Sequence, residues 1–217
     1  MKKNQIFQIV LLIACIGFVG TPKASAQQVV SGMLIPKVEQ LNKGGLNTQS
    51  LKQLANELER IALAHPQDWH AQYYASLAYI ELANLSAKRE IDNLCDRADE
   101  YLKKAQLIRP NESENYVLKA YLLSARINVN AMFRGASMGR ESKEQLDLAL
   151  RHNPNNPRAH YVRAMGIYYT PAAFGGGKKK AKAHLDASLK AYRENPPTNT
   201  LDPAWGRNEV EKLLATY

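Results

Sequence analysis

The stretch ADEYLKKAQLIRP, residues 98–110, decides the fold. Its small and apolar positions Ala98, Leu102 and Ala105 are four and then three residues apart, which places them on one face of a helix. Pro110 ends that helix, because proline has no backbone N–H and restricts the residue before it. The stretch therefore predicts a helix that packs one face against a neighbour and stops just before the proline.

The same pattern occurs twice more at a fixed distance along the chain. Pro66 lies 44 residues before Pro110, and Pro154 lies 44 residues after it. A regular period of this length is typical of helical repeat proteins, in which each repeat is a helix hairpin. In the other two copies the positions equivalent to those in residues 98–110 hold Leu54, Leu58, Ile61, Ser142, Leu146 and Ala149.

The segments after the prolines predict the other helix of each hairpin. Asn156 precedes Pro157, which is the order of a capping residue and a proline at the first helical position. Aligned positions on these helices are small at Ser76, Ala120 and Ala164, and they are bulky three residues later. Small residues allow two helices to approach closely, and bulky residues fill the space beside them.

These motifs resemble the tetratricopeptide repeat (TPR) family over residues 47–196. In that family the second helix of each hairpin carries a small, a bulky and another small residue and ends in proline, as Ala98, Leu102, Ala105 and Pro110 do here. The resemblance implies an all-α, right-handed α-solenoid. The period of 44 exceeds the family's usual ~34 residues, so each repeat holds about ten additional residues.

One solenoid domain follows a short N-terminal segment. Residues 1–26 have a basic start, an apolar run and a small-x-small motif, which are typical of a cleaved secretory signal. This signal predicts export to the periplasm or the extracellular space, with no transmembrane helix in the mature chain. The expected units are an N-terminal cap at 27–66 with a brief helix opened by Pro36, hairpins at 68–108, 112–153 and 157–196, and a capping helix at 203–217.

The N-terminus also allows a lipoprotein interpretation. Residues 12–15, LIAC, resemble a lipoprotein signal in which Cys15 is lipidated. Cleavage after residue 26 leaves Cys95 as the one cysteine of the mature chain, and a single cysteine cannot form an internal disulfide. We therefore expect Cys95 to be a small apolar helix residue.

The charge of the chain favours an acidic partner. The 217 residues carry a formal net charge of +9. Removal of residues 1–26 removes three lysines and no acid, which leaves 26 basic and 20 acidic side chains and a net charge of +6. Such an excess favours anionic partners or surfaces. No nucleic-acid recognition motif accompanies it, and export argues against that class of partner.

The pattern of histidines and nucleophiles predicts no catalytic, metal or cofactor site. Neither an HExxH motif nor paired ligands on one helix face are present. A GxSxG turn is also absent. We therefore expect a non-enzymatic protein. The five histidines are His65, His70, His152, His160 and His184.

The TPR resemblance implies that the first helices line a concave groove for an extended peptide. Their many tyrosines suit a binding surface, since each offers apolar area and one polar group. Packing between helices is the alternative for the same side chains. The residues at groove positions are His70, Tyr73, Leu77, Ile80, Val117, Tyr121, Arg158, Tyr161, Met165, Tyr168 and Tyr169.

The additional residues of each repeat predict a second candidate site, a glycine-rich basic edge. Because successive repeats stack, Arg134 and Lys178, which are 44 residues apart, should lie along one edge. Basic side chains beside exposed backbone N–H groups can bind phosphate, carboxylate or sulfate. The alternative is that the glycines only shape the turn and the lysines are solvated. The candidates are Arg134, Arg140, Gly175, Gly176, Gly177, Lys178, Lys179 and Lys180.

Three functions follow as hypotheses. The first is a protein–protein interaction module of the periplasm or envelope that binds a partner segment in its groove. The second is a binding protein for a small anionic ligand or an anionic envelope polymer at the basic edge. The third is a structural part of an envelope complex. We further expect Trp205 to be a packing anchor, with Phe174 packed beneath its helix.

Overall fold

The computed structural model describes the backbone of residues 22–217 and the side chains of residues 27–217. In that part of the chain every regular element is helical, which confirms the all-α prediction. Cys15 and the first 21 residues of the predicted signal lie outside the described residues. The helices are α1 (Pro22–Lys43), α2 (Thr48–Ala64), α3 (Trp69–Leu85), α4 (Lys88–Ile108), α5 (Ser113–Ile127), α6 (Ala131–His152), α7 (Pro157–Tyr169), a 3₁₀ turn (Ala172–Phe174), α8 (Lys178–Glu194) and α9 (Arg207–Leu214).

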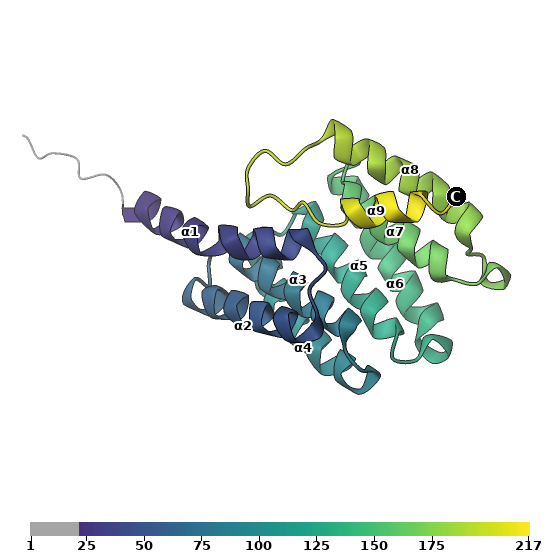
Figure 1. Ribbon diagram of the computed structural model, residues 1–217, viewed down its shortest axis with the longest axis horizontal. Helices are drawn as coiled ribbons and strands as arrows, with labels where there is room; N and C mark the ends of the chain where they lie inside the picture. Colours follow the sequence, from purple (N-terminus) through teal and green to yellow (C-terminus); the bar gives the residue numbers. More distant parts are fainter. Residues whose placement is uncertain (1–21) are drawn as a thin grey trace, which may run out of the picture.

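Helices that follow each other in the chain pack as pairs. α3 packs on α4, α5 on α6, and α7 on α8 (Figure 1). α5 also contacts α3 and α7, so the first helices of the three pairs form one layer. The turns inside the three pairs lie along one edge of the molecule (Figure 1).

The repeated prolines mark real helix ends. The C-cap residues of α2, α4 and α6 are His65, Arg109 and Asn153, each directly before one of the three prolines. At each end the backbone N–H of the capping residue still donates to the carbonyl four residues earlier. The starts of α2, α3 and α7 are capped by side chains, as in Asn156, whose Oδ1 accepts from two backbone N–H groups.

The first helix differs from the sequence prediction. α1 is one continuous helix with Pro36 inside it, whereas the sequence led us to expect Pro36 to open a brief helix. An interior proline costs about 3 kcal/mol in a helix. Here Val30, Leu34, Val38 and Leu41 are buried along one side of α1, and their burial outweighs that cost.

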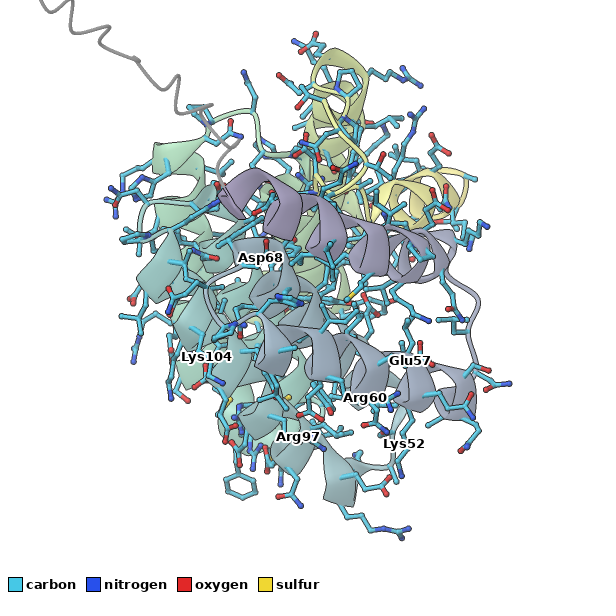
Figure 2. All side chains as sticks on the ribbon, turned by 90° about the vertical axis from the view of Figure 1, so that its left-hand side faces the viewer. Lys52, Glu57, Arg60, Asp68, Arg97 and Lys104 are labelled. Carbon is cyan, nitrogen blue, oxygen red and sulfur yellow. The ribbon has the colours of Figure 1, made fainter. Side chains whose placement is uncertain are left out.

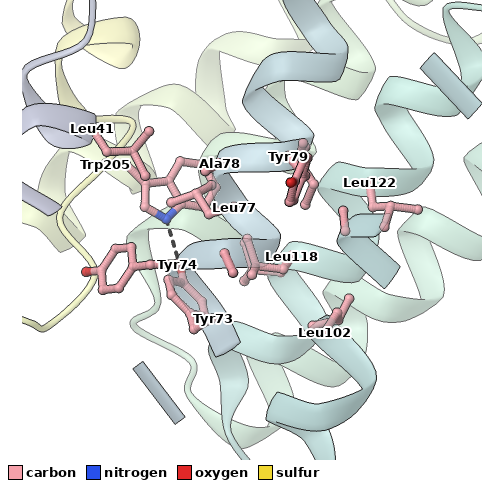
Figure 3. Packing of buried hydrophobic residues seen from close by; sticks show 14 of the residues in the cluster. Leu41, Tyr73, Tyr74, Leu77, Ala78, Tyr79, Leu102, Leu118, Leu122 and Trp205 are labelled. Carbon is pink, nitrogen blue, oxygen red and sulfur yellow. Dashed lines mark hydrogen bonds between the residues drawn. The ribbon is translucent and has the colours of Figure 1, made fainter. Parts of the chain in front are cut away.

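The centre of the core is α3. All residues from 71 to 80 are buried, because α1, α2, α4 and α5 surround this helix. Figure 3 shows Tyr73, Tyr74 and Leu77 of α3 close to Trp205, which comes from the far end of the chain. Cys95 is buried as well, as expected.

The outer faces of α2 and α4 are polar. Figure 2 shows Lys52 and Arg60 pointing outward from α2 and Arg97 from α4. Arg97 binds the carboxylate of Glu59, so this surface also ties the two helices together. Exposed ion pairs of this kind contribute little to stability.

The C-terminal helix is shorter than predicted. α9 begins only at Arg207, because Gly206 adopts a left-handed conformation with φ of +93° and turns the chain there. The segment before it crosses from α8 back over the first-helix layer (Figure 1). Trp205 is 6% exposed, so the prediction that it anchors the C-terminus by packing is confirmed.

Candidate functional site

Most residues expected to line a groove lie in the core. Tyr73, Leu77 and Ile80 of α3 and Val117 of α5 are fully buried, and Tyr161 of α7 is 4% exposed. The sequence could not show that both ends of the chain fold back over the first-helix layer. Because these side chains are buried, a partner does not reach them in this arrangement. Their contact with a partner stays a prediction.

Trp205 occupies the face that was expected to hold a partner segment. Its indole stacks on Tyr121 with ring centroids 5.2 Å apart and meets Tyr161 edge-on at 6.1 Å. Its Nε1–H donates to the hydroxyl of Tyr73 at 2.8 Å. The hydroxyl of Tyr192 donates to the carbonyl of Trp205, which fixes the backbone. The C-terminal segment therefore fills this face and is bound there by several directed contacts.

The Tyr73 hydroxyl links Trp205 to a buried ion pair. The carboxylate of Glu114 accepts from Nε and Nη2 of Arg158, both at 2.8 Å, from Asn156 at 2.6 Å and from the Tyr73 hydroxyl at 2.9 Å. Burial lowers and the carboxylate raises the pKa of Arg158, and the net shift is upward. Arg158, predicted as a groove residue, thus joins α7 to α5 inside the protein.

The remaining predicted groove residues stay partly open. His70, Tyr121, Met165 and Tyr168 are half-buried, and Tyr169 is 68% exposed at the end of α7. Burial, with the nearby charge of Arg109, lowers the pKa of His70. Of the predicted set, Tyr169 is the residue most open to a ligand.

The glycines of the predicted basic edge form a tight turn between α7 and α8. Gly175 and Gly177 have φ of +85° and +110°, which glycine adopts without strain. A Cβ on Gly176 would lie 2.2 Å from a backbone oxygen. The N–H groups of all three donate to carbonyls within this turn or at the end of α7. These N–H groups are therefore not free to bind an anion, and the expectation that they do is corrected.

The basic side chains predicted at this edge have different surroundings. Arg134 binds Asp92 through two hydrogen bonds of 2.7 and 2.8 Å, so its charge is compensated. Lys180 donates to the carbonyl of Gly175 at 3.0 Å. Lys179 and Arg140 are exposed. Phe174 is 81% exposed instead of being packed beneath Trp205, since Tyr121, Tyr161 and Tyr73 occupy that place.

The end of α7, the start of α8 and the residues after α9 carry a group of aromatic and basic side chains, which we call the tyrosine–lysine cluster. Its members are Tyr168, Tyr169, Lys178, Lys182 and Tyr217. Burial and the neighbouring Tyr168 raise the pKa of Tyr217, which links the end of α7 to the C-terminal residues. The rings of Tyr168 and Tyr169 meet edge-on at 5.0 Å. The ammonium groups of Lys178 and Lys182 lie 4.8 and 5.7 Å from the centre of the Tyr217 ring.

Hydrogen bonds hold the cluster in place. Lys178 donates to the carbonyl of Thr216, and the Tyr217 hydroxyl donates to the carbonyl of Lys178. Tyr169 and Tyr217 remain 68% and 45% exposed. Sequence reasoning named Tyr168, Tyr169 and Lys178, but in two separate sites. Lys182 also pairs with Asp186 at 2.8 Å, so Lys178 contributes most of the uncompensated positive charge beside these exposed aromatic rings.

The described residues offer few other features of a chemical site. Two surface depressions are each lined by a single helix, one by residues 186–194 of α8 and the other by residues 53–60 of α2. Among residues 27–217 no group of three or more His, Cys, Asp or Glu side chains could hold a metal ion. No helix in the described part of the chain is both long and apolar enough to cross a membrane.

The fold and the tyrosine–lysine cluster define an all-α protein with an exposed aromatic and basic surface site. No protein-family model and no curated protein matches the sequence. Among solved structures the chain is similar to the HusA haemophore from Porphyromonas gingivalis, with 34% sequence identity and a TM-score of 0.77. The match covers 86% of this chain and 92% of that one. The chain therefore belongs to the same family as this haemophore.

Proposed function

We propose that this chain is an exported, non-enzymatic protein that binds haem or a closely related tetrapyrrole at the tyrosine–lysine cluster. Family membership with a haemophore supports a tetrapyrrole as the ligand. It also supports export, through a signal at residues 1–26 or, as the alternative, a lipid anchor at Cys15. The three helix pairs, with their prolines 44 residues apart, support a TPR-like right-handed solenoid as the scaffold.

The single observation that carries the location is the meeting of aromatic rings and lysines on an open surface. A tetrapyrrole of the haem type is a flat apolar disc with carboxylates at one side. Tyr169 and Tyr217 offer exposed rings on which such a disc can stack. Lys178 supplies an ammonium group that can pair with one of its carboxylates, and Lys182, which is bound to Asp186, supplies a second one by exchanging that partner for the ligand. The proposal keeps the second hypothesis from the sequence, a binding protein for a small anionic ligand. It places the ligand on side chains next to the glycine turn and not on the glycine N–H groups.

The first hypothesis, a partner segment in the concave groove, has less support. Trp205 and the segment that carries it occupy that face, and the Tyr73 hydroxyl joins Trp205 to the ion pair of Glu114 and Arg158. A partner would have to displace a buried tryptophan, its two aromatic contacts and its hydrogen bond to Tyr73. We therefore do not assign peptide binding to that face.

The proposal is tested by titrating residues 27–217 with hemin and recording the absorbance of the hemin at each step. Wild type should bind saturably at one site. Replacement of Tyr169 by alanine removes one stacking partner, worth about 1 kcal/mol, and should weaken binding about fivefold or more. The double variant Lys178→Ala/Lys182→Ala should weaken it further and reduce its dependence on salt.

Matched controls exist on the same molecule. Leu107 is 82% exposed at the other end of the helix pairs, so Leu107→Ala should bind hemin as wild type does. Lys190→Ala, on the same helix as the two lysines of the cluster, should also leave the affinity unchanged. Absence of saturable hemin binding by a folded wild type, or equal affinity in the Tyr169 and Leu107 variants, would refute the proposal.

A further inference from the structure

Four large apolar side chains protrude from the turns inside the helix pairs. Leu85 ends α3, Met132 and Phe133 begin α6, and Phe174 lies in the turn before α8. Their exposed fractions are 52%, 89%, 81% and 81%. Because these turns lie along one edge of the molecule (Figure 1), we call these four residues the apolar tips. Exposed apolar side chains that gather on one part of a surface often mark a site of protein or membrane contact, whereas singly scattered ones are common.

The net charge of the chain is concentrated in these turns and in the starts of the helices that follow them. Residues 84–92, 128–140 and 170–182 together hold eight basic and two acidic side chains, a net charge of +6. Residues 27–217 as a whole also have a net charge of +6, so the remainder of the chain is neutral. Two of these basic side chains are paired, Arg134 with Asp92 and Lys182 with Asp186 one turn further along α8, so the others carry the charge of this edge. The edge therefore faces its surroundings with basic side chains interleaved with apolar ones.

The shape of this edge distinguishes it from a small-ligand site. A small molecule is usually bound in a concave site that covers most of its surface. The apolar tips instead lie at helix ends and in one turn, and at more than four-fifths exposed Met132, Phe133 and Phe174 are covered little by the rest of the protein. Protruding apolar groups flanked by lysine and arginine fit a lipid surface, where the apolar groups enter the headgroup region and the cations meet lipid phosphates.

We propose that the apolar tips and the basic residues around them dock this protein onto an anionic lipid surface. Phe133 and Phe174 insert at the level of the headgroups, and Arg140 and Lys179, both exposed, lie against lipid phosphates. This docking is separate from tetrapyrrole binding, which we assign to the tyrosine–lysine cluster. It would bring the end of α7 and the start of α8 close to the membrane surface.

Co-sedimentation of residues 27–217 with lipid vesicles tests this proposal. The protein should bind vesicles that contain phosphatidylglycerol, and far less those of phosphatidylcholine alone, and salt should weaken binding. The double variant Phe133→Ser/Phe174→Ser should bind at least about tenfold more weakly, since each inserted phenylalanine contributes a hydrophobic transfer term. The matched control is Leu107→Ser, an equally exposed apolar residue away from the edge, which should bind as wild type does.

Crossed measurements separate this proposal from the proposed function. The Phe133→Ser/Phe174→Ser variant should keep its affinity for hemin, and Tyr169→Ala should keep its affinity for vesicles. Equal vesicle binding by the phenylalanine and Leu107 variants overturns the docking proposal, as does equal binding to neutral and anionic vesicles. If wild type binds anionic vesicles but does not bind hemin, the docking proposal stands and only the proposed function is refuted.

Discussion

Replacement of Glu114 by glutamine tests how the C-terminal segment is held on the helix layer. Glutamine keeps the size of the side chain and still accepts from Tyr73, but it removes the charge that balances Arg158. The side chains of Glu114 and Arg158 are only 6% and 11% exposed. Removal of one partner of a buried ion pair leaves the other charge uncompensated and costs about 3–5 kcal/mol.

That loss is large enough to measure by thermal and chemical unfolding. For a chain of this length each kcal/mol lowers the midpoint by about 2–4 °C, so Glu114→Gln should lower it by roughly 6–20 °C. The double variant Glu114→Gln/Arg158→Met removes the stranded charge and should be more stable than Glu114→Gln alone. The control is Glu211→Gln in the exposed pair with Arg207, which should cost less than about 1 kcal/mol. A Glu114→Gln protein within 1 kcal/mol of wild type would refute the reasoning.

Three further predictions follow from the packing and the ionisation of buried groups. Gly176→Ala should cost about 2–3 kcal/mol in chemical unfolding, because its Cβ would overlap a backbone oxygen, whereas Gly135→Ala, which meets open space, should be neutral or slightly stabilising. Burial raises the pKa of Glu81 to about 7, so the native state holds its proton more tightly than the unfolded chain does, and stability should fall as the pH rises from about 4.5 to about 7. Half-buried histidines with lowered pKa values make stability rise with pH instead. The quantity to measure is therefore the free energy of unfolding of wild type minus that of Glu81→Gln, which should change by on the order of 2 kcal/mol across that pH range. Burial also raises the pKa of Cys95 to about 11, so a thiol reagent should label it only when the protein unfolds, and rapid labelling of the native protein would contradict the structure.

Local rules predicted the helix ends well. Pro66, Pro110 and Pro154 each follow a helix C-terminus, because the loss of the N–H and the clash of the ring act within one turn of the chain. The cap at Asn156 was also predictable, since it depends on residues two and three positions away. Pro36 shows the limit of such rules, because tertiary burial of the α1 face outweighs the local penalty.

The filling of the first-helix face was not predictable from spacing. Trp205 and Tyr73 are 132 residues apart, and their hydrogen bond depends on how the whole C-terminal segment crosses the molecule. For the same reason Phe174 was expected in the place that tyrosines occupy. The burial of Tyr161 and Arg158 follows from this crossing and leaves Tyr169 as the exposed tyrosine of α7.

The candidate site was found in parts. The tyrosines at the end of α7 and the lysines at the start of α8 stood out in the sequence, but they were assigned to different surfaces. Their meeting requires Tyr217 to return to the start of α8, which is a tertiary contact of 39 residues in separation. The glycines were correctly linked to a turn as the alternative interpretation, because positive φ angles favour glycine.

The most direct test of the account is to map tetrapyrrole binding by NMR. Metal-free protoporphyrin would be titrated into isotope-labelled residues 27–217, and the backbone amide shifts would be followed. The account predicts shifts centred on Tyr168, Tyr169, Lys178 and Tyr217, with α2 and α4 unchanged. Shifts centred on the outer faces of α2 and α4, or no saturable shifts at all, would contradict it.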